Sequence, residues 1–310
     1  MIRLTGRFHH VATKSATALT TFPLTLLSWN IDQERPNSGA RVAKEKRLEK
    51  LVACIESIPD VDFVTFQESS KAVPKAMTHA GSMKWLGEAQ ARTYNGYLQV
   101  FQLKSSAWSA RVAWQYTGLT FETWPTVLQP LIGEDPWKID GSALRQIKSP
   151  IVRISNIHLD GATINHEIRS SAIRYYTTVP ESDIIIGDGQ YRSEDIFPPH
   201  YADAFVMTGK PAGARYTLDT HENKYFSHQG ANYSRSTRAY VRQEITETSL
   251  LQGEDTKFPE GHSTPSRGNR PAFNIRATEM KVLKPWTSED APRSGVSDHY
   301  GLLVRFMIEM

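Results

Sequence analysis

The sequence has little of what would mark a disulfide-stapled, membrane-spanning or strongly charged protein. It has a single cysteine, Cys54, so no internal disulfide can form, and this favours a reducing compartment. No apolar run approaches the roughly 18 residues that a membrane-spanning helix needs. The formal net charge of +3 is a weak indication of an anionic partner, and charge alone does not identify a nucleic-acid binder.

One domain is expected from residue 24 to residue 310, because there is no internal repeat and no clear interdomain linker. Residues 1–23 contain Arg3, Arg7 and Lys14 and no acidic residue. This composition resembles a mitochondrial transit peptide, and a disordered leader is the alternative. We therefore expect an intracellular protein, in the nucleus or cytoplasm, or in mitochondria if the leader is a transit peptide. The polar stretch 246–270 is predicted to be an insertion loop.

A buried strand is predicted immediately before Asp188. The apolar β-branched run 184–186 ends at Gly187, and Gly189 follows the aspartate. The strand therefore carries a carboxylate to the rim of a sheet. The two glycines would let the backbone turn sharply and let a ligand approach closely. An ordinary Gly-Asp turn is the alternative interpretation.

Other predicted strands also place polar side chains at their ends. The residues concerned are Asn30 and Asp32 after strand 24–31, Glu68 after strand 61–66, His158 and Asp160 after strand 151–158, and Asp298 and His299 before strand 300–308. Because each adjoins a hydrophobic run that should be buried, we expect these side chains at one rim. The remaining predicted elements are helices over 41–58 and 169–177, strands over 96–103, 111–116, 142–147, 235–242 and 277–283, and loops over 124–141 and 201–225.

Several carboxylates and two histidines at one rim would be unfavourable without a compensating cation or an anionic substrate. Asp, Glu and Asn oxygens are the donors that Mg²⁺ or Mn²⁺ prefers, whereas a cysteine-rich set would suit zinc. A divalent ion, a carboxylate that deprotonates water and histidines that stabilise a charged phosphorus centre together suit a phosphodiester hydrolase.

Five short motifs carry a resemblance to a known family. They are Ser28-Trp29-Asn30-Ile31-Asp32, Phe66-Gln67-Glu68, Asn156-Ile157-His158-Leu159-Asp160, Gly187-Asp188-Gly189-Gln190 and Ser297-Asp298-His299. In this order they resemble the motifs of the endonuclease/exonuclease/phosphatase superfamily. The first and last look most like the branch that contains the 5′-tyrosyl-DNA phosphodiesterase, as does Tyr216-Thr217-Leu218-Asp219. The resemblance implies a four-layer α/β sandwich of the deoxyribonuclease I type, with two packed mixed β-sheets flanked by helices.

The resemblance also implies roles for single residues. Glu68 would be the main Mg²⁺ ligand, with Asp32 and Asn30 assisting. Asp188 would activate the attacking water, while His158, and His299 held by Asp298, would contact the scissile phosphate. Gln190 would orient the phosphate or the nucleophile. The candidates for further contacts to substrate are Arg145, Asp160, Arg192 and Thr217.

Two positions depart from the superfamily pattern. Gln190 stands where asparagine is usual, which moves the amide by one methylene. Thr237 stands where an aspartate normally supports the catalytic histidine, so we expect His299 to be less basic than its counterpart. Either activity is reduced, or another acid such as Asp219 takes that role.

The leading hypothesis is therefore a Mg²⁺- or Mn²⁺-dependent phosphodiesterase or nuclease that acts on DNA ends or 5′-tyrosyl adducts, as in DNA repair. A phosphate- or nucleic-acid-binding scaffold without activity is the second hypothesis. The third is a hydrolase of a lipid or small-molecule phosphoester. The expected partner is a nucleic acid or another phosphoester, and the expected state is a monomer without a membrane span.

Overall fold

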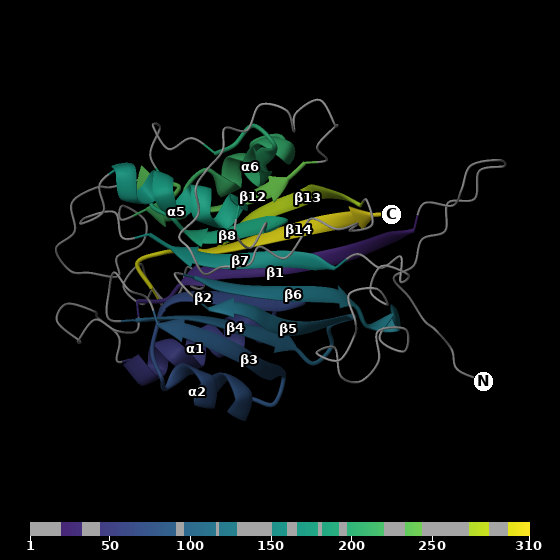
Figure 1. Cartoon of the computed structure of the whole chain (residues 1–310). Coiled ribbons are helices and arrows are strands. Elements are labelled where there is room, and N and C mark those ends of the chain that lie inside the picture. The colour runs from purple at the N-terminus through teal and green to yellow at the C-terminus, as the bar shows by residue number, and fades with distance from the viewer. Residues whose placement is uncertain are drawn as a thin grey trace, which may run out of the picture.

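A computed structural model describes residues 20–32, 44–90, 96–115, 118–128, 151–159, 166–178, 182–191, 197–219, 233–243, 273–284 and 297–310. Two six-stranded β-sheets pack face to face (Figure 1). The first sheet has the order β13 (Asn274–Leu283), β14 (Gly301–Glu309), β1 (Thr21–Asn30), β2 (Phe63–Ser69), β4 (Tyr97–Leu103) and β3 (Met83–Gln90). The second has the order β5 (Trp108–Gln115), β6 (Leu119–Pro125), β7 (Val152–His158), β8 (Ile184–Asp188), β12 (Thr237–Arg242) and β9 (Tyr201–Asp203).

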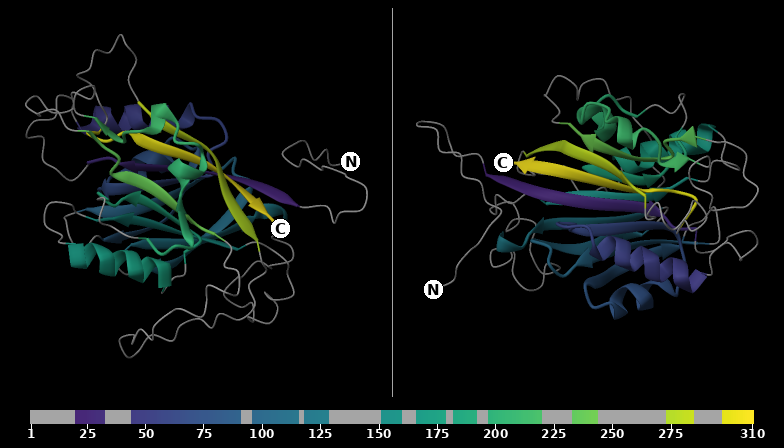
Figure 2. Two further views of the ribbon diagram at one scale, coloured as in Figure 1. Left: turned by 90° about the horizontal axis from the view of Figure 1, so that it is seen from above. Right: turned by 180° about the vertical axis from the view of Figure 1, so that it is seen from behind.

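Helices complete four layers. Helices α1 (Lys44–Glu56) and α2 (Val73–His79) cover the outer face of the first sheet, and α5 (His166–Thr178) covers the second (Figure 2, left). The short elements are α6 (Ala204–Met207), β10 (Leu218–Asp219), β11 (Tyr233–Ser234) and the 3-10 turns Thr126–Leu128 and Ala212–Ala214. No helix among the described residues is long and apolar enough to cross a membrane.

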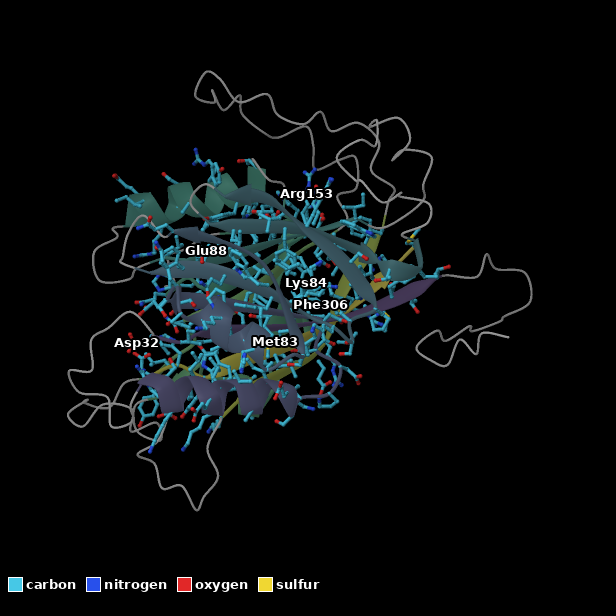
Figure 3. All side chains as sticks on the ribbon, turned by 90° about the horizontal axis from the view of Figure 1, so that it is seen from below. Asp32, Met83, Lys84, Glu88, Arg153 and Phe306 are labelled. Atoms are coloured by element: carbon cyan, nitrogen blue, oxygen red, sulfur yellow. The ribbon has the colours of Figure 1, made fainter. Side chains whose placement is uncertain are left out.

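Alternation along the strands divides the apolar side chains between the layers. In β1, Leu24 and Leu26 enter the core between the sheets, whereas Leu27 and Trp29 pack toward the helices α1 and α2. Phe306 lies between the sheets and Met83 lies on the helical side (Figure 3). The predicted four-layer sandwich of two mixed sheets is confirmed.

Strand directions bring the predicted polar residues to one end of the sandwich. Strands β1 and β2 are parallel, as are β7 and β8, so both pairs finish at the same end of their sheets. Strands β14 and β12 run antiparallel to β1 and β8 and therefore begin there. Residues 30, 68, 158, 188, 237 and 299 consequently lie at six neighbouring strand termini.

The structure differs from the sequence-based prediction in several elements. Strand β1 begins at Thr21, three residues earlier than expected, while β3, β6 and α2 were not predicted. In β3 a β-bulge between Trp85 and Gly87 breaks the alternation on which a strand prediction depends. Trp124 and Pro125 end β6 rather than opening a loop, and the stretch 201–219, expected to be irregular, contains β9, α6 and β10. The predicted strand 142–147 and the predicted insertion 246–270 lie outside the described residues.

Candidate active site

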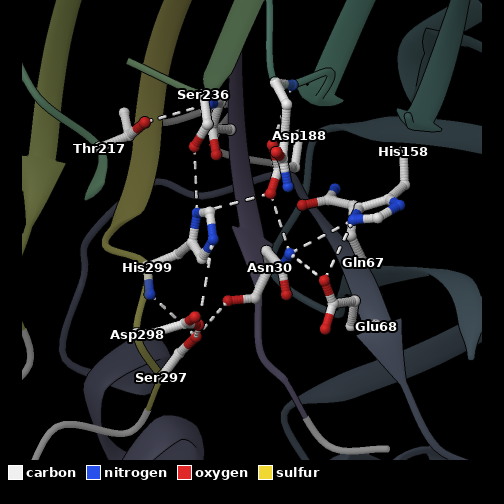
Figure 4. Close-up of polar contacts among 12 residues, drawn as sticks. Asn30, Gln67, Glu68, His158, Asp188, Thr217, Ser236, Ser297, Asp298 and His299 are labelled. Carbon is white, nitrogen blue, oxygen red and sulfur yellow. Dashed lines mark hydrogen bonds and ion pairs between the residues drawn. The ribbon is translucent and has the colours of Figure 1, made fainter. Parts of the chain in front are cut away.

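Asn30, the last residue of β1, connects the two sheets at this end. Its Nδ2 donates hydrogen bonds to Glu68 Oε1 and to Asp188 Oδ2, each at 2.9 Å. The same nitrogen lies 3.5 Å from His158 Nε2 (Figure 4). Asn30 is buried, so its amide fixes two carboxylates that come from different sheets. The predicted convergence of the strand ends is therefore observed.

Glu68 and His158 form an ion-pair contact across the sheets. Glu68 Oε1 lies 3.2 Å from His158 Nε2, and the glutamate side chain is 13% exposed, against 2% for the histidine. Burial acts to raise the pKa of Glu68, but the hydrogen bond and charge of His158, together with the Asn30 amide, outweigh it and lower the pKa to about 2. Glu68 is therefore an ionised carboxylate with an edge open to solvent.

His299 contacts three polar side chains. Its Nδ1 lies 3.2 Å from Ser236 Oγ and 3.5 Å from Asp188 Oδ2, and its Nε2 lies 3.9 Å from Asp298 Oδ1. Burial acts to lower the pKa of the imidazole, but the nearby carboxylates, chiefly Asp188 and then Asp298, outweigh burial and raise it. The protonated form of His299 is thus favoured beside Asp188.

Buried hydrogen bonds fix the backbone around His299. Its N–H donates to Ser297 Oγ at 3.1 Å, and that hydroxyl donates to the Asn30 carbonyl at 2.6 Å. Trp29 Nε1 donates to the His299 carbonyl at 3.0 Å. The start of β14 is therefore tied to the end of β1.

The side chain near the start of β12 that reaches His299 is not the one expected from the sequence. The sequence predicts Thr237 at the position of the supporting aspartate, but the contact comes from Ser236, one residue earlier. Thr237 is paired with Asp188 in the β8–β12 register, and its buried Oγ1 has no hydrogen-bond partner among the described residues. Asp219, the other acid considered, is buried next to the β-bridge that joins Leu218 to His299.

Three site residues adopt left-handed backbone conformations, which are costly for residues other than glycine. They are Asp32 (φ 43°), Glu68 (φ 50°) and Gln190 (φ 41°), each at the end of a strand. The backbone N–H of Gln190 donates to Asp188 Oδ1 at 3.2 Å. Three of the five described non-glycine residues with positive φ therefore lie at the ends of β1, β2 and β8.

The glycines beside Asp188 serve the protein's own packing. Gly187 has φ +143°, and a Cβ there would lie 2.0 Å from the Ile157 carbonyl oxygen. A Cβ at Gly189 would lie 2.2 Å from the Tyr191 ring. Other atoms do approach both glycines closely, as expected. They are the Ile157 backbone and the Tyr191 ring of this chain, however, and not a ligand.

The oxygen donors at this end suit a hard divalent cation. Glu68 is ionised, and Asp32 is buried near enough to help raise the pKa of His299. Within the described ranges, no three or more His, Cys, Asp or Glu side chains are arranged so that together they could hold a metal ion. Mg²⁺ is commonly held by one or two carboxylates, with waters and substrate phosphate oxygens completing the shell. The carboxylates of Glu68 and Asp32 are therefore of the chemical kind that Mg²⁺ or Mn²⁺ prefers.

The four predicted substrate-binding residues have different outcomes. Thr217 is fully buried, and its Oγ1 accepts the backbone N–H of Thr237 at 3.0 Å, so in the structure it supports β12. Arg145, Asp160 and Arg192 lie outside the described residues. Sequence reasoning missed Ser236, which no motif singled out. It also missed the buried amides of Gln67 and Asn156, although both stand within the quoted motifs.

Comparison with known proteins gives a likeness of fold. No protein-family model and no curated protein matches the sequence. A structure of D. rerio TDP2 complexed with single strand DNA product is 17% identical, with a TM-score of 0.58 over 92% of this chain and 98% of that one. An endonuclease/exonuclease/phosphatase family protein from Bacteroides thetaiotaomicron is 13% identical, with a TM-score of 0.55 over 93% and 95%. A Bacteroides thetaiotaomicron VPI-5482 mannosyl-6-phosphatase is 13% identical, with a TM-score of 0.54 over 91% and 99%.

Proposed function

We propose that this chain, which has the fold of the endonuclease/exonuclease/phosphatase proteins that its motifs resemble, is a metal-dependent phosphoric ester hydrolase acting on a nucleic-acid phosphodiester. The observation that carries the proposal is the connection of Glu68 and Asp188 through the single amide of Asn30. It places a candidate metal ligand and a candidate general base on either side of one fixed group. The structures of TDP2 with DNA and of a sugar phosphatase support phosphoester chemistry on this fold.

Each site residue has a separate task in this proposal. Glu68, assisted by Asp32, would hold a divalent cation, which when bound neutralises charge on the phosphate. Asp188 accepts the proton of the attacking water, and Asn30 holds its carboxylate in one orientation. The neighbouring carboxylates favour the protonated form of His299, which presents positive charge to the phosphate, as does His158 when protonated.

The test is hydrolysis of a short 5′-tyrosyl oligonucleotide and of the same oligonucleotide without the adduct, with Mg²⁺ or with EDTA. The wild type is compared with Asp188→Asn, whose amide cannot accept the proton. Asp203→Asn is the control. Asp203 lies on the edge strand β9, and its carboxylate forms an ion pair with Arg235 and none with the site residues named above. We expect Mg²⁺-dependent turnover in the wild type and in the control, and a loss of at least about 100-fold in Asp188→Asn.

The substrate panel separates the alternatives. A sugar 6-phosphate and a phosphodiester lipid are included, because a mannosyl-6-phosphatase shares the fold. Turnover of either one without turnover of DNA would overturn the nucleic-acid assignment and keep the hydrolase. Binding of the oligonucleotide without turnover of any substrate, in Mg²⁺ or Mn²⁺, would favour the non-catalytic scaffold.

A further inference from the structure

A β-bulge in the first sheet sets the position of Glu68. The last regular pair of β2 with β4 before the irregularity is Phe66 with Gln99, and the next is Ser69 with Tyr97. Gln67 and Glu68 therefore both face the one intervening residue of β4. The left-handed backbone of Glu68 belongs to this bulge. Because bulges of this kind turn a side chain out of its regular direction, the bulge determines where the Glu68 carboxylate lies.

Asn156 of the second sheet reaches across the core to this bulge. Its Nδ2 donates to the Phe66 carbonyl at 2.9 Å and to the Gln99 carbonyl at 3.3 Å. These carbonyls belong to the residue pair at which the register shifts. Its Oδ1 accepts a hydrogen bond from Gln67 Nε2 at 2.6 Å. Asn156 is fully buried, so the amide is committed at both ends to residues at the bulge.

Gln67 extends the link to a third strand. Its Nε2 also donates to Ser28 Oγ of β1 at 3.0 Å, two residues before Asn30. The hydrogen bonds thus run from Asn156 of β7 through Gln67 of β2 to Ser28 of β1. Because side chains alternate along a strand, Asn156 lies on the same face of β7 as His158.

We propose that Asn156 is a positioning residue that holds the β2 bulge and so fixes the Glu68 carboxylate against His158. It touches no reacting group and acts through Glu68. The part that concerns activity rests on the proposed function, whereas the part that concerns the bulge does not. Buried amides with every polar atom used fix local geometry strongly, because any displacement leaves donors or acceptors unpaired.

The experiment compares Asn156→Ala with Ser155→Ala. Ser155 is the neighbouring buried residue of β7, but its hydroxyl bonds with Thr120 and Ser182, so its loss weakens the same strand without touching the bulge. Asn156→Ser, which keeps one donor, serves if the alanine variant does not fold. Hydrogen exchange of the β2 amides at residues 66–69, Mn²⁺ binding and phosphoester turnover are measured on each full-length variant.

We expect Asn156→Ala to speed exchange at residues 67–69 at least tenfold and to weaken Mn²⁺ binding by about 10- to 100-fold, as loss of a group supporting a ligand typically does. Ser155→Ala should change neither. In a Glu68→Gln background the effect of Asn156→Ala on kcat/KM should disappear. Equal effects of the Asn156 and Ser155 variants on exchange and Mn²⁺ binding would overturn the positioning role. Absence of turnover in every protein, with the exchange difference present, would count against the proposed function and leave the role of Asn156 in the bulge supported.

Discussion

The Nε2 atom of His158 lies 3.2 Å from Oε1 of Glu68, and these two residues belong to different sheets. The contact therefore joins the two sheets at the end of the sandwich where the candidate active site lies. Ion pairs with little exposure and a further hydrogen-bond partner couple more strongly than exposed pairs do. Here the further partner is Asn30, whose amide donates to the same glutamate oxygen.

A double-mutant cycle with Glu68→Gln and His158→Ala should therefore give a coupling free energy of about 1–2 kcal/mol for unfolding. The control cycle uses Glu279 and Arg305, which lie 2.8 Å apart but are about one-third exposed, at 32% and 36%. Its coupling should stay below about 0.5 kcal/mol because solvent screens the pair. Urea unfolding of the four proteins in each cycle measures both values. Equal coupling in the two cycles would mean that the cross-sheet contact contributes no more than a surface pair.

The Ser236 hydroxyl contacts His299, whereas the Thr237 hydroxyl does not. We therefore expect loss of the first hydroxyl to lower activity and loss of the second to leave activity unchanged. Ser236→Ala removes the oxygen 3.2 Å from His299 Nδ1, so we expect kcat/KM to fall by about tenfold. Thr237→Val removes a buried hydroxyl without a hydrogen-bond partner among the described residues while keeping its shape. It should leave kcat/KM within about twofold and raise the free energy of unfolding by about 1 kcal/mol.

Steady-state kinetics and urea unfolding on both variants measure these effects. A tenfold loss in Thr237→Val with none in Ser236→Ala would restore the assignment made from the sequence.

Gly187 of β8 lies so close to the backbone of Ile157 on β7 that there is no room for a side chain. In Gly187→Ala the new Cβ would lie 2.0 Å from backbone, where no side chain can move aside, and the φ of +143° is itself unfavourable for alanine. We expect a loss of at least about 3 kcal/mol in the free energy of unfolding. Gly81→Ala is the matched control, since Gly81 also has a positive φ (+85°) but nothing within 4 Å of its Cβ position. That variant should lose only about 1 kcal/mol, the cost of the backbone conformation. Similar losses in the two variants would show that conformation, rather than the approach to Ile157, decides the effect.

The sequence predicted the strands that carry the site because each combines a buried apolar run with a polar residue at its end, as Ile184–Asp188 does. The sequence did not predict the features that depend on contacts between strands far apart in the chain. Ser236 directly precedes β12, and only the folded structure shows that its hydroxyl, and not that of Thr237, lies next to His299. The β2 bulge was not predicted either, because the sequence Phe66-Gln67-Glu68 is typical of the regular end of a strand. Asn156, which hydrogen-bonds to the bulge, lies 90 residues away in the sequence, and its amide meets the Phe66 carbonyl only after the sheets have packed.

Glu122 on β6 lies between two arginines on the neighbouring strands. Its Oε2 is 2.6 Å from Arg111 Nη2 and its Oε1 is 2.9 Å from Arg153 Nε, and both arginines are its direct cross-strand neighbours. Burial acts to raise the pKa of Glu122, but the two positive charges outweigh it and lower the pKa. A carboxyl whose pKa is lower in the folded than in the unfolded chain stabilises the fold above its unfolded value of about 4.3, and this contribution is lost as the pH falls through the folded value.

Glu122→Gln should therefore lower the free energy of unfolding by about 2 kcal/mol at pH 7, because two guanidinium groups are left facing each other without a counter-charge. The difference from wild type should begin to shrink as the pH falls below about 4.3, where the carboxyl of the unfolded chain becomes protonated, and should shrink further as the pH falls through the lower pKa of the folded state. Urea unfolding at pH 7, 5 and 3.5 measures it. Glu279→Gln, which removes a partly exposed carboxylate from the edge strand β13, should cost less than about 0.5 kcal/mol at each pH. A loss in Glu122→Gln that stays constant across this range would assign the effect to side-chain shape and hydrogen bonding instead of charge.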